Sequence, residues 1–190
     1  MRGEETRQTI VQKADEIFYR QGFEATSFAD IADAVGISRG NFYHHFRTKD
    51  AILDAVIDMR REHTRSMLVE WEDSTTDPAE RVNCFVRILI TNQARIMLHG
   101  CPVGTLCTEL AKLQHPALHR AKHIFALFGD WLERQFRALG HDEPEARDRA
   151  LRVLAFSQGV ATLAAAFRDE TYVRREVDRM CDLIRQQAPL

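Results

Sequence analysis

Long apolar runs are absent from this sequence of 190 residues. None approaches the roughly 20 apolar residues that a membrane-spanning helix needs. The N-terminal segment MRGEETRQTIVQK also lacks the apolar stretch of a secretory signal. We therefore expect a cytoplasmic protein that does not contact the membrane. The 45% share of hydrophobic residues is enough to form a real core, which excludes a disordered chain.

An excess of positive charge is also absent, because the formal net charge is −2. Any contact with nucleic acid must then come from a local patch, not from the surface as a whole. Cysteine is scarce, and four residues in a chain of this length do not make a disulfide framework, so we expect free thiols in a reducing cytosol. They are Cys84, Cys101, Cys107 and Cys181.

Strand-like alternation is missing as well, whereas apolar residues recur at helical spacing almost throughout. The sequence therefore predicts an all-α protein. Glycines, prolines and capping residues divide it into about nine helices. The first ends at Gly22, and the others span about 27–36, 38–46, 48–71, 77–98, a short stretch from 102, 116–140, 142–167 and 169–187. We expect two domains, residues 1–50 and residues 51–190.

Residues 28–43 have the spacing of a helix-turn-helix. Ala32 is small where two helices would cross, and Gly36 allows the turn between them. Residues 39–49 contain no acidic side chain, which gives the local cationic patch that phosphate contact requires. The small core that fixes the angle between the two helices would be formed by Ile31, Val35, Ile37 and Phe42.

The run FADIADAVGISRGNFYHHFRTKDAIL resembles the DNA-binding motif of the TetR family of repressors, including Phe42-Tyr43, Phe46 and Lys49. The resemblance is specific over about residues 7–55 and extends further only as a general all-helical plan. It implies a homodimer without enzymatic activity that binds a palindromic double-stranded DNA operator. It also implies a second domain that binds a small-molecule inducer and thereby releases the DNA. An activator with the same DNA-binding mechanics is the alternative to a repressor.

The exposed N-terminal part of the second helix in such a motif faces base edges. We place Arg39 and Asn41 there, because arginine pairs with guanine and asparagine with adenine through two hydrogen bonds. His44, one turn further on, is the third candidate. Ser38 and Gly40 complete the predicted DNA contacts on this helix. Phosphate contacts, which position the protein without reading sequence, are predicted for Thr26, Ser27, Tyr43, His45 and Lys49.

The last two long helices are predicted to form the dimer interface. Small side chains at spacings of three and four residues let a partner helix approach closely, and the last helix adds an apolar stripe. The alternative is that these faces pack inside one chain. The predicted interface residues are Ala155, Gly159, Thr162, Leu163, Ala166, Val177, Met180 and Ile184. We expect the fourth helix, which begins at Lys49, to transmit ligand binding to the recognition helices.

A ligand pocket is expected among the helices of the second domain, where aromatic and aliphatic side chains accompany a few polar groups. Such stripes are more often plain core, which is the alternative. The predicted lining residues are Phe85, Leu89, Gln93, Met97, Cys101, Thr105, Phe125, Phe128 and Phe167.

The stretch HGCPVGTLC, residues 99–107, places two thiols beside a bend between helices. Pro102 puts Cys101 at a helix N-terminus, where the helix dipole favours the reactive thiolate. Some TetR-family repressors that resemble this chain in a Gly-Cys-Pro segment respond to quinones, aldehydes or oxidants. We therefore hypothesise that Cys101 senses an electrophile or oxidant, with Cys107 as the candidate resolving thiol. Two structural thiols are the alternative, and a helix places residues six apart on opposite sides, which opposes their pairing.

Two further interpretations of this stretch were weighed. A metal-sensing repressor would use His99, Cys101, Cys107 and His115, but separations of two, six and eight residues match no standard zinc spacing. A thiol enzyme would pair Cys101 with His99 or His115, and it would leave the helix-turn-helix unexplained. We expect no metal and no cofactor.

Overall fold

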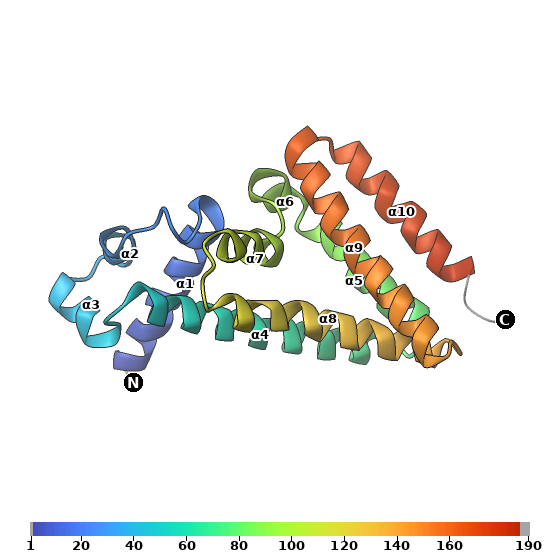
Figure 1. The fold of residues 1–190 in the computed structure, drawn as a ribbon, viewed down its shortest axis with the longest axis horizontal. Helices are drawn as coiled ribbons and strands as arrows, with labels where there is room; N and C mark the ends of the chain where they lie inside the picture. Colours follow the sequence, from blue (N-terminus) through green and yellow to red (C-terminus); the bar gives the residue numbers. More distant parts are fainter. Residues whose placement is uncertain (1, 187–190) are drawn as a thin grey trace. The chain divides into compact units, whose positions relative to one another are not determined.

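Residues 2–186 are described by a computed structural model and form ten α-helices (Figure 1). No strand occurs within these residues, so the prediction of an all-α fold is confirmed. The helices are α1 (Arg2–Gln21), α2 (Phe28–Val35), α3 (Arg39–His45), α4 (Lys49–Ser74), α5 (Pro78–Thr91), α6 (Gln93–His99), α7 (Pro102–Lys112), α8 (Leu118–Ala138), α9 (Glu143–Phe167) and α10 (Glu170–Gln186). The predicted last residue of the final helix, Gln187, lies outside the described residues.

The helix predicted for residues 77–98 is two helices, α5 and α6, because the chain turns at Asn92. Both the backbone N–H and the side-chain amide of Asn92 donate to the carbonyl oxygen of Ile88, at 3.0 and 3.3 Å. Asparagine competes in this way with the regular helical hydrogen bonds, which ends α5. Gly100, at a φ of 77°, ends α6 as predicted.

The described chain folds into two compact units, residues 2–63 with 105–124 and residues 64–104 with 125–186. Helices α4, α7 and α8 each contribute one part to either unit. The boundary predicted after residue 50 concerns sequence domains and stays a prediction. Residues 49–63 of α4, about four turns, belong with the N-terminal helices, and Ile52, Leu53 and Val56 are fully buried there.

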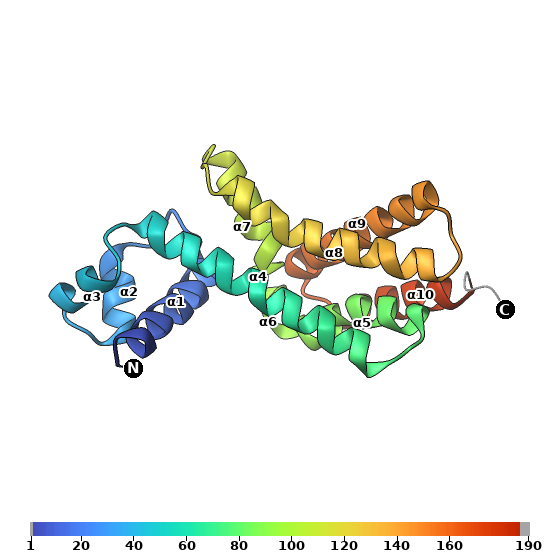
Figure 2. The ribbon, with the colours of Figure 1, turned by 90° about the horizontal axis from the view of Figure 1, so that it is seen from below.

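The first unit surrounds a single apolar core. Figure 2 shows α1, α2 and α3 gathered around the first turns of α4. Ile10, Phe42 and Leu53 are almost fully buried in this core. Leu106 and Leu110 of α7 belong to the same core, so a helix distant in the sequence supports the N-terminal helices.

Helix α2, the first helix of the motif, begins with a capping box. The hydroxyl of Ser27 accepts a hydrogen bond from the N–H of Asp30 at 3.1 Å, and the Asp30 carboxylate accepts one from the N–H of Ser27 at 2.7 Å. The box satisfies two N–H groups that a helix start leaves open. Gly36, in the left-handed conformation, ends α2 at the predicted place.

The second unit packs α10 against α5 and α9, and the three helices lie side by side in Figure 1. An aromatic cluster at its centre joins Trp71 of α4, Phe85 of α5, and Phe128 and Trp131 of α8. Neighbouring rings have centroids 5.2 to 6.5 Å apart, within the range of favourable edge-to-face contacts.

The capping box makes the stability of the first unit depend on pH. The N–H and then the hydroxyl of Ser27 lower the pKa of Asp30 below its ordinary value of 3.8. A carboxyl with a lowered pKa stabilises the fold above its unfolded pKa, and this stabilisation is lost as the pH falls through the folded value. The stability difference between wild type and Asp30→Ala should therefore shrink below about pH 4 in urea unfolding followed by circular dichroism.

Candidate nucleic-acid interface

Helix α3 separates a buried face from an exposed one. Phe42 is 1% exposed and Phe46, which directly follows the helix, is 4% exposed, so both anchor α3 on the core. Most of the remaining positions of this short helix are exposed. The exposed side chains include four predicted DNA contacts, Arg39, Asn41, Tyr43 and His44, while His45 is half-buried.

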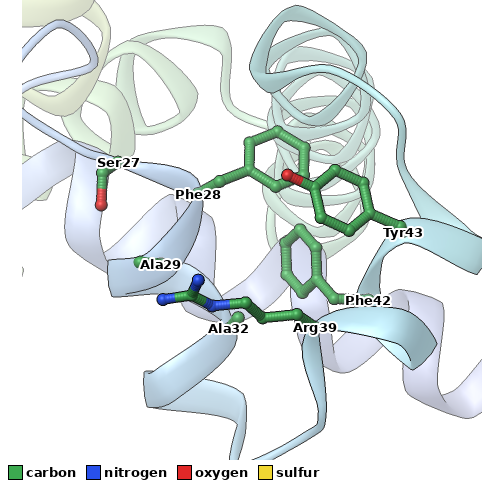
Figure 3. A pocket seen from close by; sticks show the side chains of 7 residues that line it. All are labelled: Ser27, Phe28, Ala29, Ala32, Arg39, Phe42 and Tyr43. Carbon is green, nitrogen blue, oxygen red and sulfur yellow. The ribbon is translucent and has the colours of Figure 1, made fainter.

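A recess between α2 and α3 opens on this exposed face (Figure 3). The Tyr43 ring, 54% exposed, stacks on Phe28 with centroids 5.3 Å apart and planes 19° apart. Phe28 meets the buried ring of Phe42 edge to face at 5.0 Å, so the orientation of Tyr43 is tied to the core. Arg39 extends from α3 along the other side of the recess towards α2.

Serine side chains hold the starts of both helices. Ser38 caps α3, and its hydroxyl accepts the N–H of Asn41 at 3.3 Å. Ser27 caps α2 and is exposed at the edge of the recess. The hydroxyl oxygens of Ser27 and Ser38 thus accept from backbone N–H groups, and each hydroxyl also carries one O–H donor.

Lys49 occupies a different environment from the one predicted. Its ammonium group donates to the carbonyl oxygens of Phe23, Glu24 and Thr26 at 2.9, 3.2 and 3.0 Å. It also lies 4.3 Å from the centre of the Phe23 ring. An ammonium group has three N–H donors, and these three bonds use all of them. In this structure Lys49 therefore stabilises the turn between α1 and α2, and its phosphate contact stays a prediction.

Thr26 is likewise directed into the protein. Its side chain is 1% exposed, and its hydroxyl donates to the carbonyl oxygen of Gly22 at 2.6 Å. The hydroxyl oxygen also accepts from the side-chain amide of Gln21 at 3.3 Å. Thr26 thus closes the same turn, and its phosphate contact also stays a prediction.

Family models cover both parts of the chain. Residues 10–56 match the model of bacterial regulatory proteins of the tetR family, and residues 78–178 match the LmrA/YxaF-like C-terminal domain of transcriptional regulators. The chain belongs to the TetR family. It is therefore a DNA-binding transcriptional regulator, as the helix-turn-helix predicted.

Individual proteins of the TetR family are also similar to this chain. The chain is 24% identical over 169 residues to the transcriptional regulator LmrA of Bacillus subtilis, covering 88% of this chain and 90% of LmrA. It is 26% identical over 129 residues to the transcriptional repressor DhaR of a Mycobacterium species, covering 67% and 62%. A TetR regulator from Chloroflexus aurantiacus has the same fold, with a TM-score of 0.85, 23% identity and full coverage of both chains.

The residues predicted to line a ligand pocket of this TetR-family chain differ widely in how deeply they are buried. Gln93 is 7% exposed, and its side-chain nitrogen has no hydrogen-bond partner among the described residues. Thr105 is exposed and Phe167 is 66% exposed, which opposes a lining role for both. Phe85, Leu89 and Phe128 are buried, whereas Met97, Cys101 and Phe125 are half-buried.

Three further buried polar atoms in the second unit are not among the polar anchors predicted from the sequence. The side-chain oxygen of Asn83, the indole nitrogen of Trp131 and Nε2 of His141 lack partners within residues 2–186. Buried polar groups are normally hydrogen-bonded, so such atoms suit a bound ligand. The sequence signal for Asn83 is an amide inside the apolar stripe of α5.

The four residues considered for a metal do not form a cluster. Across residues 2–186, no three His, Cys, Asp or Glu side chains are placed to hold a metal ion. Cys107 packs against the core of the first unit, whereas His99 and Cys101 belong to the second.

The exposed residues of α3 make base reading testable. Arg39→Ala or Asn41→Ala should weaken binding to a duplex selected by the protein from a random library by about 1–3 kcal/mol. Each variant should also relax specificity at one operator position. Arg47→Ala, in the same cationic run, is the control and should weaken selected and random duplexes alike. Equal losses on both duplexes for Arg39→Ala would contradict its assignment to base edges; fluorescence anisotropy measures both.

Proposed function

We propose that this protein is a cytoplasmic repressor that binds a palindromic operator as a homodimer and leaves it when an electrophile or oxidant modifies Cys101. Support for repression comes from the relative DhaR, which is named a repressor. Support for the sensor comes from the surroundings of the Cys101 sulfur, and this observation carries the proposal.

The Cys101 sulfur stands where a serine or threonine oxygen usually caps a helix. It accepts the backbone N–H of Gly104, three residues on, at 3.4 Å. The side-chain amide of Gln158 on α9 donates to the same sulfur at 3.5 Å. N–H groups at a helix start carry partial positive charge, and hydrogen bonds to an ionised acceptor are the stronger ones. Both donors hold the sulfur at the start of α7, and a cysteine acts as a nucleophile through its thiolate form.

Gly104 is required for this arrangement. A Cβ atom at residue 104 would overlap the side-chain oxygen of Gln158, so a larger residue would push the amide away from the sulfur. Cys101 is half-buried and therefore reachable by a small reagent. When its thiolate adds to a ring carbon of a quinone, a C–S bond forms, the quinone takes up the electron pair as a hydroquinone after gaining protons, and the added ring displaces Gln158.

Replacing the sulfur tests the sensor. The Cys101→Ser protein should keep the cap, because a hydroxyl accepts the same N–H groups, and should bind the selected duplex as wild type does. Treatment with benzoquinone or hypochlorite should release wild type from the duplex in a gel-shift assay but leave Cys101→Ser bound. Cys107→Ser is the matched control and should be released like wild type. Release of Cys101→Ser by both reagents at the wild-type dose would refute the sensor.

The proposed dimer surface lies on α9. An apolar stripe at spacings of three and four residues is exposed along the whole helix, while Val153, Val160 and Ala164 on the other face are buried. A helix that is apolar on both faces is typical of one buried on both. The exposed stripe contains five of the predicted interface residues and comprises Leu151, Ala155, Gly159, Thr162, Leu163, Ala166 and Phe167.

Helix α10 contributes less to this surface than predicted. Val177 and Ile184 are 1% and 3% exposed, because α10 packs against α5 and α9 of the same chain. Met180 is half-buried, and Leu183 is exposed. We therefore revise the proposed interface to α9 with Leu183.

The apolar stripe explains a second property of α9. By length and composition alone it is the one helix in residues 2–186 that could cross a membrane, with 33% of its apolar window buried. A partner copy that covers the exposed face accounts for the same composition without a membrane.

A charge in the middle of the stripe tests the dimer. A Cβ at Gly159 meets no atom within 4 Å, so Gly159→Glu should leave the single chain intact. A buried unpaired carboxylate at the interface should make the protein monomeric and weaken binding to the palindromic duplex by at least about tenfold. Sedimentation velocity and anisotropy measure both effects. Ala126→Glu, on an exposed position of α8, is the control, and a dimeric Gly159→Glu protein would exclude this surface.

A further inference from the structure

The turn between α1 and α2, residues 22–26, is bound by a carboxylate from a distant helix. The N–H of Phe23 donates to one oxygen of Glu109 at 3.0 Å, and the N–H of Glu24 donates to the other at 2.9 Å. Glu109 lies on α7, 86 residues beyond Phe23. Charge-assisted hydrogen bonds of this kind are about twice as strong as neutral ones.

Lys49 also binds this turn, because its ammonium group donates hydrogen bonds to three of the carbonyl oxygens of the turn. An anion thus binds the N–H groups of the turn, and a cation binds its carbonyl groups. We call Glu109 and Lys49 the turn clamp. With both kinds of backbone group engaged, the turn has one preferred conformation.

Gly22 is fitted to this clamp. Its φ of +92° is a conformation that other residues rarely adopt, and a Cβ there would lie 2.8 Å from a carboxylate oxygen of Glu109. His115, in the turn after α7, meets the Phe23 ring edge to face at 5.3 Å. The turn is therefore enclosed by α7 and by the residues that follow it.

The clamp acts directly on the helices that face DNA. Thr26, at the end of the turn, is followed by Ser27, the cap of α2. Phe28, the first residue of α2, carries the stacked ring of Tyr43 on α3. A shift of the turn therefore moves the start of α2 and changes the support of α3.

We propose that Glu109 is a positioning residue for DNA recognition: its carboxylate fixes the turn between α1 and α2 to α7, and α7 thereby connects to the reading helices independently of α4. The DNA-binding part of this inference rests only on the contacts of the turn clamp. Its use in induction rests also on the proposed sensor, since Cys101 caps the same helix.

Helix α7 is short and continuous between these two points. Cys101 and Glu109 are eight residues apart, which corresponds to about 12 Å along a helix. A displacement of the first turn of α7 therefore reaches the carboxylate without passing through a loop. The route lies within one helix and needs no change in α4.

Glu109→Gln tests the positioning role. Glutamine has the same size but one acceptor oxygen, so its amide nitrogen faces a backbone N–H and one of the two bonds is lost. We expect binding to the selected duplex to fall about tenfold while binding to random DNA changes less than about twofold. Hydrogen exchange should accelerate in residues 22–27. A residue that only stabilised the fold would lower the active fraction and leave the ratio of the two affinities unchanged.

Glu70→Gln is the matched control, because it removes the same charge from an exposed position of α4 and should behave as wild type. Gly22→Ala is a second variant, which keeps the Glu109 carboxylate but displaces it from the turn. It should lower the same ratio of affinities for selected and random DNA. Wild-type ratios in both Glu109→Gln and Gly22→Ala, with unchanged exchange in residues 22–27, would overturn the proposal. If Glu109→Gln unfolds, the affinity ratio measured for Gly22→Ala decides whether the turn clamp positions the DNA-binding helices.

The two proposals fail in different experiments. Release of Cys101→Ser by quinone would remove the sensor and leave the clamp standing. An unchanged affinity ratio in the clamp variants would remove the clamp whatever Cys101 does. If both proposals hold, benzoquinone should lower the affinity of Glu109→Gln for the selected duplex by a smaller factor than that of wild type. The substitution has then already removed part of the affinity that modification of Cys101 would remove. An equal loss in the two proteins would separate the clamp from induction.

Discussion

The DNA-reading helices depend on how the turn before α2 is held. Phe23, Glu24 and Thr26 carry backbone N–H and carbonyl groups that water would otherwise satisfy, and charged side chains from α4 and α7 take the place of that water. Because an ionised partner binds a backbone group more strongly than a neutral one, the turn is stiff without regular structure. The capping box of α2 and the stacking of Tyr43 on Phe28 both begin from this fixed point.

Local sequence patterns predicted the helix-turn-helix well, because its caps and its glycine act within four residues. Local sequence patterns did not predict contacts between residues far apart in the sequence. Lys49 was assigned to phosphate because a cation in a basic run beside a DNA-binding motif usually has that role, yet its partners lie 23 to 26 residues earlier. Glu109 gave no signal at all, since nothing in its surrounding sequence records two backbone N–H groups 85 and 86 residues away. Asn92 was overlooked because its effect comes from a side-chain bond to the preceding turn.

Periodicity also leaves open which partner covers an apolar face. The stripes of α9 and α10 look equivalent in sequence, but α10 turns Val177 and Ile184 towards its own chain. The stripe of α9 from Leu151 to Phe167 stays exposed because the opposite face already fills the core. Amphipathic spacing predicted a contact surface on both helices. The packing of α10 on α5 is a contact within the chain, whereas the exposed stripe of α9 stays the predicted dimer surface.

The proposed role of Cys101 depends on its position at the start of α7. The Cys101 sulfur accepts the N–H of Gly104 at the start of α7, and a thiol caps a helix less well than a serine hydroxyl. In the proposed mechanism, alkylation adds bulk beside Gln158 and so acts on the first turn of α7. At the other end of the same helix, Leu110 is fully buried and Glu109 binds the turn. A movement or loss of that first turn would then change the force on the turn that places α2.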